Sequence, residues 1–176
     1  MKVVIFLINI ILLSSITISF FGCGYKPTAQ YARVVVGEKI STTVVISSQD
    51  PENTVLIKDA LDRAIIEVFH SSLTTRKLSQ THINVSLAKV LYTPLQYDEN
   101  GYIIGYRASI FLSIERITNN KSKRYKTKGS YDFSVVANAV MTDKERFDAI
   151  NFGSIKAIKS FISQVSAEGA IIQEGK

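Results

Sequence analysis

Residues 102–115 show the clearest alternation of apolar and polar positions in the chain. Successive side chains of a β-strand point to opposite faces, so an apolar residue at every second position predicts a strand with one apolar face. We expect helices to cover that face. Its apolar positions are Tyr102, Ile104, Tyr106, Ala108, Ile110, Leu112 and Ile114.

Two earlier segments have the same two-residue period. Residues 33–46 predict one strand, or two short strands around a turn at Gly37-Glu38. Residues 83–90 predict another strand, and the apolar phase slips near Lys89, which indicates a bulge or a strand end there.

Turn signals separate the later strands. Asn100-Gly101 is the strongest short-range hairpin signal, and it precedes the strand that begins at residue 102. Asn119-Asn120 predicts a second turn, after which residues 131–135 resume the alternation. The segment between residues 83 and 135 is therefore expected to form three consecutive strands.

Two segments have helical spacing instead. Asp50-Pro51-Glu52 predicts a helix start, because Asp caps free amides and Pro suits the first helical position; this helix is expected to end near residues 71–75. Thr142 and Glu145 form a capping box that opens a second helix. The apolar stripes are Leu61, Ile65, Val68 and Phe69 in the first helix, and Phe147, Ile150, Ile155, Ile158, Phe161, Ile162 and Val165 in the second.

The predicted order is strand, helix, three strands, helix. It indicates an α+β fold, in which a four-stranded, mostly antiparallel sheet has two amphipathic helices packed on one face. Residues 33–167 are expected to form this single domain, and residues 168–176 a flexible tail. The chain has 176 residues, which suits one domain with a real core and hardly allows two.

The first 22 residues have a different character. Residues 3–21 contain no charge, which is long enough for an uncleaved membrane helix. A secretory signal peptide is favoured, because Lys2 stands at the extreme N-terminus, Ser and Thr thin out the apolar run, and the small residue Gly22 closes it. The only cysteine of the chain, Cys23, follows directly.

A lone cysteine at this junction is typical of a bacterial lipoprotein. Phe20-Phe21-Gly22-Cys23 matches the lipoprotein box at Gly22 and Cys23, and departs from it at Phe21, where a small residue is usual. Residues 1–22 are then the signal, Cys23 carries the lipid, and residues 23–32 form a tether. Two or three acyl chains make a stable membrane anchor. No Asp follows Cys23, so the expected location is the periplasmic side of the outer membrane.

Charge and composition exclude little by themselves. The net charge is +6, and loss of Lys2 with the signal would leave +5, which fits nucleic acid, anionic lipid or an acidic partner about equally well. One Cys and two His residues, His70 and His82, exclude an internal disulfide and a zinc site. Each histidine is more simply a surface or helix-end residue than a general base. No catalytic set emerges, so we expect a protein that is not an enzyme and needs no cofactor or metal.

One cluster of cations stands out between residues 121 and 128. It could bind phosphate groups, or it could form a solvated edge strand whose lysines discourage aggregation. Alternate cations of a strand would share one face. An exported lipoprotein rarely meets nucleic acid, so an anionic lipid is the preferred ligand. The cluster consists of Lys121, Lys123, Arg124, Lys126 and Lys128.

Several stretches together resemble one family. They are Cys23-Gly24-Tyr25, the helix at residues 50–69, the hairpin at residues 95–117 with its segment Tyr97–Tyr106, and the C-terminal amphipathic helix. From Cys23 to about Val165 the chain is similar to the lipopolysaccharide-assembly lipoprotein of Gram-negative outer membranes, the LptE type.

The resemblance implies both a fold and a role. The family fold has two helices on a four-stranded sheet. Its members plug a large outer-membrane β-barrel translocon, help that barrel fold, and bind lipopolysaccharide or lipooligosaccharide. Assigning that ligand to the cations of residues 121–128 rests on their charge density. The alternatives are an auxiliary lipoprotein of an envelope lipid-transport system of the ABC type, and a membrane-tethered enzyme.

Overall fold

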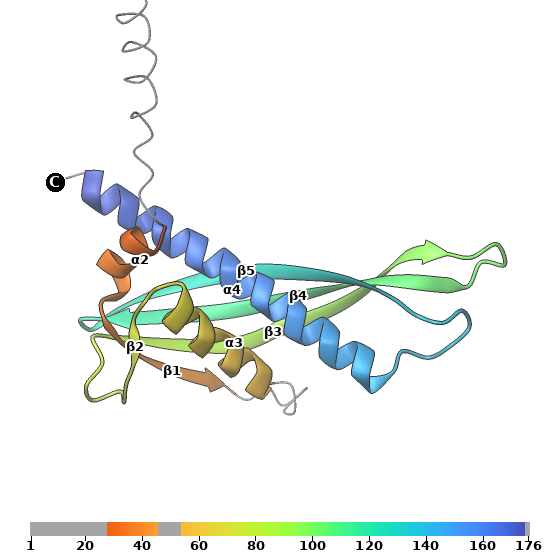
Figure 1. Cartoon of the computed structure of the whole chain (residues 1–176), viewed down its shortest axis with the longest axis horizontal. Coiled ribbons are helices and arrows are strands. Elements are labelled where there is room, and N and C mark those ends of the chain that lie inside the picture. The colour runs from red at the N-terminus through yellow and green to blue at the C-terminus, as the bar shows by residue number, and fades with distance from the viewer. Residues whose placement is uncertain (1–27, 46–53, 175–176) are drawn as a thin grey trace, which may run out of the picture.

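The computed structural model describes residues 28–45 and 54–174 (Figure 1). The predicted signal peptide, Cys23 and the helix start at Asp50-Pro51-Glu52 lie outside these residues. The described elements are α2 (Thr28–Val36), β1 (Lys39–Val45), α3 (Thr54–Glu67), β2 (Ser72–Leu73), β3 (Thr81–Tyr97), β4 (Ile103–Thr118), β5 (Lys121–Ser134) and α4 (Asp143–Glu174).

The sheet is mixed and has five strands, in the order β2-β1-β3-β4-β5. β1 runs parallel to both β2 and β3, whereas β3, β4 and β5 pair antiparallel. The prediction of four mostly antiparallel strands is corrected on two points. It missed the two-residue β2, and it did not foresee that the helical crossover through α3 makes β1 and β3 parallel.

Residues 28–36 correct the prediction further. They form a helix, so the structure has three helices among its described residues rather than two, and the predicted strand at 33–46 begins only at Lys39. Ala32, Val35 and Val36 are buried, which is the spacing of one helical face. Gly37 then turns the chain with a φ of +76°, a backbone conformation that glycine adopts at little cost.

The structure confirms both predicted hairpins and the predicted bulge. Asn119 and Asn120 have φ values of 49° and 60° and connect β4 to β5. Gly101, with a φ of +82°, closes the turn between β3 and β4. The register between these two strands shifts between Leu87 and Lys89, where the phase slip indicated a bulge.

α4 crosses the sheet diagonally along most of its length (Figure 1). The capping box that opens it is present: Glu145 accepts a bond from the Thr142 amide at 2.7 Å, and the Glu145 amide donates to the Thr142 hydroxyl at 3.2 Å. The helix continues to Glu174, through a segment that the sequence analysis expected to be a flexible tail.

Glycine lets α4 lie directly against its neighbours. A Cβ added to Gly129 of β5 would lie 1.9 Å from the carbonyl oxygen of Gly153 in α4. A Cβ added to Gly169 would lie 1.9 Å from the carbonyl oxygen of Tyr31 in α2. The backbone of α4 therefore lies directly against the backbones of β5 and α2 at these two glycines.

The core lies between the sheet and its helices. Alternate residues of β3, β4 and β5 point into it, as predicted for β4, and they pack against α3, α4 and α2. We call the opposite side the open face, because none of the described helices covers it. Buried apolar side chains of the core include Ile57, Leu61, Ile83, Ile110, Leu112, Ile114, Ile158 and Phe161.

Candidate functional site: the basic open face

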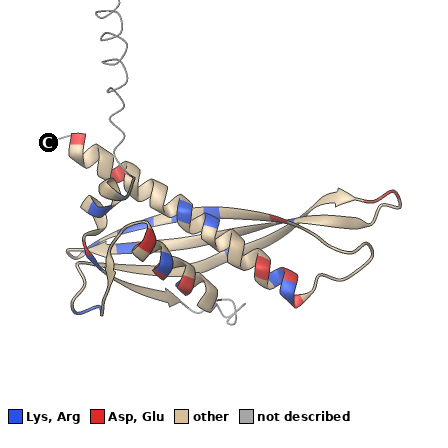
Figure 2. Ribbon diagram, viewed as in Figure 1, with Lys and Arg blue, Asp and Glu red and all other residues tan. Residues whose placement is uncertain are grey.

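The five cations of residues 121–128 divide between the two faces of β5. Tyr125 and Thr127 are buried on the helix side. Because side chains alternate along a strand, Lys121 and Lys123 project to the helix side as well. The remaining three share the open face, as the alternation predicts: Arg124, Lys126 and Lys128. Figure 2 shows basic residues on the strands at the end of the sheet remote from the β3–β4 turn.

Strand pairing adds residues that the sequence analysis missed. Lys128 pairs with Phe111 of β4, and Phe111 pairs with Lys89 of β3, so two lysines flank one aromatic ring. Lys126 pairs with Ser113, which pairs with Ser86. The slip in the hydrophobic phase marked an irregularity at Lys89. Only the strand register shows that Lys89 pairs with Phe111.

The cations of the open face differ in how they are engaged. Arg124 Nε lies 3.5 Å from Glu115 Oε1, although its side chain stays 79% exposed. Lys128 Nζ lies 5.5 Å from the centre of the Phe111 ring. Lys126 is exposed, and no ion pair or hydrogen bond of its ammonium group occurs within the described part of the chain. An exposed ion pair stabilises little, so these cations remain available to an anionic ligand.

Glu115 pairs with Arg124 on this face, and Asp132 of the same face pairs with Arg107. A hydrogen bond from Ser122 at 2.6 Å, together with the Arg124 charge, holds the pKa of Glu115 below its usual range. Glu115 is thus ionised at neutral pH and offsets part of the charge of Arg124. Lys89, Lys126 and Lys128 keep an excess of positive charge around Phe111.

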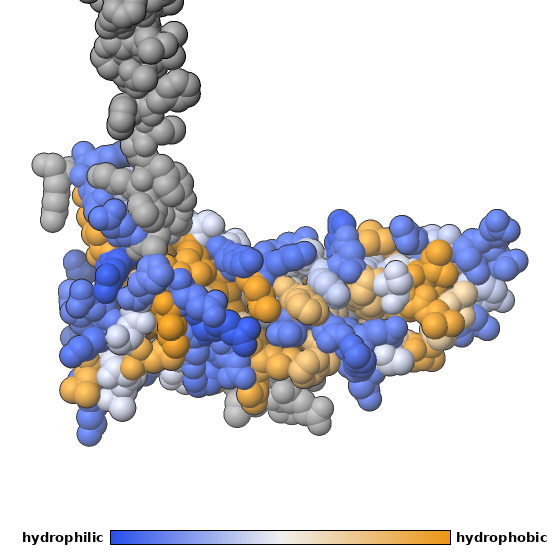
Figure 3. Space-filling view, in the orientation of Figure 1, coloured by the Kyte–Doolittle hydropathy of each residue, from blue (hydrophilic) through white to orange (hydrophobic). Residues whose placement is uncertain are grey.

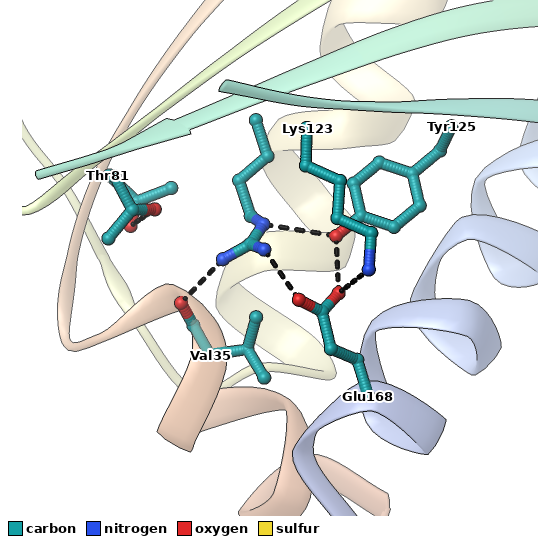
Figure 4. A network of polar contacts seen from close by, with 7 residues as sticks. Val35, Thr81, Lys123, Tyr125 and Glu168 are labelled. Atoms are coloured by element: carbon teal, nitrogen blue, oxygen red, sulfur yellow. Dashed lines mark hydrogen bonds and ion pairs between the residues drawn. The ribbon is translucent and has the colours of Figure 1, made fainter. Parts of the chain in front are cut away.

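Lys123 belongs to a different group of residues, which we call the Glu168 network (Figure 4). Glu168 of α4 accepts bonds from Arg116 Nη2 at 2.8 Å and from the Tyr125 hydroxyl at 2.6 Å, and Lys123 Nζ lies 2.9 Å from it. Arg116 also donates to the backbone carbonyl of Val35 in α2 at 3.0 Å. The network therefore joins β4, β5, α2 and α4.

Burial and the neighbouring cations shift the pKa of Glu168 in opposite directions. Burial alone would raise the pKa of Glu168, but hydrogen bonds from Tyr125 and Lys123 and the charge of Arg116 outweigh it and hold the pKa below its usual range. Burial, followed by the bond to Glu168, raises the pKa of Tyr125 to about 12. Glu168 is therefore ionised and Tyr125 neutral at physiological pH. The partners of Lys123 are consistent with a structural role.

The two histidines have different surroundings. His70 follows α3, is exposed and has a φ of 51°. His82 is buried on β3, with its Nδ1 2.8 Å from the hydroxyl of Ser41. Burial and the Arg76 charge lower the pKa of His82. Ser41 is only 4% exposed, so this Ser–His pair offers no access to a substrate.

A second surface feature lies between α3 and α4. It is a groove with a volume of about 370 Å³, with a mainly apolar floor and a charged rim. Its rim carries Asp59, Arg63 and Glu67 of α3 and Lys159 of α4, and none of its described lining residues is a nucleophile or a histidine. The lining includes Ala60, Arg63, Ala64, Glu67, Ile155, Ile158 and Lys159.

The described residues contain neither a metal-binding cluster nor a membrane-spanning helix. Within residues 28–45 and 54–174, no three metal-binding side chains come together in a way that would hold an ion. No helix in the same part of the chain combines the length and hydrophobicity needed to cross a membrane.

No family model matches this sequence, and no curated protein matches it. Solved structures do share its fold. Lipoprotein B from Nitrosomonas europaea, described as uncharacterized, has a TM-score of 0.52 at 14% identity and covers 76% of this chain and 84% of its own. Rare lipoprotein B from Shewanella oneidensis has a TM-score of 0.50 at 14% identity and covers 78% and 99%.

The chain has the fold of small bacterial lipoproteins. Identities this low establish the fold alone. The likeness supports the α+β lipoprotein architecture, while membership of the lipopolysaccharide-assembly family and the role that goes with it stay predictions.

Proposed function

We propose that this protein is a lipid-anchored component of the bacterial outer membrane. It acts as plug and folding partner of a β-barrel translocon, and it assists lipopolysaccharide or lipooligosaccharide assembly without being an enzyme. The lipoprotein box at Gly22-Cys23 and the fold shared with lipoprotein B support the anchor and the compartment.

The basic open face is the observation that supports lipopolysaccharide as the ligand. Arg124, Lys126 and Lys128 project from one strand face, and Lys89 lies across Phe111 from Lys128. Lipid A carries phosphates on a sugar backbone. Cations form charge-assisted bonds to phosphate, and the ring and nearby serine hydroxyls suit the sugar. Acylation of Cys23 would raise the effective concentration of the protein at the membrane that holds this ligand.

Binding of purified lipopolysaccharide tests the ligand. Alanine at Arg124, Lys126 and Lys128 should weaken binding at least tenfold at low salt and flatten its salt dependence. A control variant with alanine at Lys77, Lys121 and Lys159 removes the same charge from other surfaces, and it should bind nearly as the parent does. Equal binding by both variants would contradict the assignment.

Purification of the tagged full-length protein from detergent-solubilised membranes tests the partner. A β-barrel partner is recognised because it stays folded in detergent until heated and then changes its gel mobility. Its recovery supports the plug role, whereas an inner-membrane ABC transporter would support the alternative role. Loss of membrane retention in Cys23→Ser is expected if Cys23 carries the lipid.

A further inference from the structure

The outer part of the β3–β4 hairpin forms an arm, which we define as residues 90–106; its inner end packs against the core at Val90 and Tyr92. Figure 1 shows it extending past the N-terminal end of α4. The two strand segments of the arm, residues 90–97 and 102–106, contain no charged residue. Its only charges are Asp98 and Glu99 in the turn, so the arm is uncharged along its length and acidic at its tip (Figure 2).

The two faces of the arm differ in exposure. On the helix side, Tyr92 and Tyr106 are half-buried, and their rings lie 6.4 Å and 6.1 Å from the ring of Phe133. On the open face, Leu91 is 39% exposed. Apolar residues alternate with polar ones over the arm in Figure 3.

The apolar surface continues to the tip. Leu95, Tyr97 and Tyr102 are 42%, 59% and 46% exposed. Asp98 itself is occupied in the turn, where its carboxylate accepts bonds from the amides of Asn100 and Tyr102. Glu99 is exposed and leaves the tip with an accessible negative charge.

We propose that this arm is the surface with which the protein enters its β-barrel partner. The partner would present an uncharged wall along the arm and cations around Asp98 and Glu99. The inference rests on the proposed function, which supplies the barrel, and adds the docking surface and the chemistry of its complement. Several exposed apolar side chains on one element are typical of an interaction surface, and the charge distribution of the arm indicates the kind of partner.

The backbone argues against a lipid bilayer as the occupant. β1 ends at Val45, which pairs with Ser86, so none of the described strands pairs with the outer edge of β3 beyond that point. Unpaired backbone groups are costly in hydrocarbon, and so are the carboxylates of the tip. A protein that supplies polar partners at chosen positions avoids both costs.

The outer edge of β3 in the arm is also poorly suited to pairing with a strand of the partner. Pro94 has no amide hydrogen to donate, and the register with β4 shifts between Leu87 and Lys89 and again between Pro94 and Gln96. Proline and bulges are devices that prevent an edge strand from pairing with another. The faces of the arm, and not its edge, are therefore the contact surface.

Site-specific photo-cross-linking in the host cells tests the proposal. A photoreactive phenylalanine analogue replaces Leu95 or Tyr97 in the arm, and Ile66 or Leu73 as controls; all four positions are exposed. The arm positions should cross-link to a protein whose gel mobility changes on heating, and the control positions should not. Tyr97→Lys should lower barrel recovery at least tenfold, and the matched Ile66→Lys should not.

The outcomes separate the two proposals. If the barrel is recovered but cross-links only from Ile66 or Leu73, the arm is not the docking surface, and the proposed function stands. If no barrel is recovered and the arm cross-links to lipid or to a second copy of the chain, both proposals fail. Glu99→Lys should also reduce recovery, and normal recovery would overturn the basic complement at the tip.

Discussion

Strand β5 carries cations on both faces, and the two faces differ in what surrounds those cations. On the helix side, Lys123 and Arg116 converge on Glu168, between α4 and α2. On the open face, Lys126 and Lys128 project from a surface that none of the described helices covers. Charge density along a sequence therefore does not define a binding site. The alternation of the strand assigns some cations to the fold and leaves others to a ligand.

The largest expected effect comes from breaking the Glu168 network. Glu168→Ala leaves Arg116 without its carboxylate, and Arg116 is only 11% exposed. Removing one partner of a largely desolvated ion pair is strongly destabilising. Because the Glu168 side chain is still 20% exposed, we expect the lower end of the usual range, a fall of about 3 kcal/mol in the free energy of unfolding. Denaturant titration measures the change. A loss below about 1 kcal/mol would show that the network contributes little.

The next largest loss of stability is expected from disturbing the contact between Gly129 of β5 and Gly153 of α4. Gly129→Ala places a methyl group against the Gly153 carbonyl oxygen, so α4 must shift, at a cost of about 2 kcal/mol. Gly105→Ala is the control, because there the added Cβ would meet the Gln96 side chain at 3.2 Å, and that side chain is flexible. Equal stability of the two variants would contradict the backbone contact.

The pH dependence of stability tests the charge of Glu168 on the helix side. The folded-state pKa of Glu168 lies below its ordinary value of 4.5, so its contribution is present above that pH and is lost as the pH falls through the folded pKa. The stability difference between the parent and Glu168→Gln should be largest near neutral pH and shrink in acid. Titrating both proteins between neutral pH and pH 3 checks this; a constant difference would contradict it.

The smallest effect is expected on the open face. Lys126→Ala should change the free energy of unfolding by no more than about 0.5 kcal/mol, because its ammonium group has no partner among the described residues. Lys123→Ala on the opposite face should cost up to about 1 kcal/mol, since Lys123 pairs with Glu168. Finding the reverse order would remove the distinction between the two faces.

Local patterns predicted the later strands and most of both helix stripes. In the second stripe Phe147 is 45% exposed, whereas Ile150, Ile158, Phe161, Ile162 and Val165 are buried. β4 has one buried face, so its hydrophobic alternation follows its burial, and the turn residues fix where it begins and ends. α2 was missed because its three consecutive valines, residues 34–36, favour strands by propensity. Packing against α4 at Gly169 outweighs that preference.

The candidate site was predictable only in part. The alternation placed Arg124, Lys126 and Lys128 on one face, because these three lie on one strand. Lys89 joins them through the register of a different strand, which a bulge sets. The pairing of Arg116 with Glu168 spans 52 positions and leaves no local pattern.

The contact between α2 and the end of α4 also constrains when the protein can fold. A chain is made from its N-terminus, so Tyr31, whose backbone lies against Gly169, is synthesised long before that glycine. The β3–β4 and β4–β5 hairpins need only neighbouring residues, and they can form earlier. α2 can therefore pack only after α4 has been synthesised. A chain that ends before Glu168 would leave the apolar face of α2 uncovered.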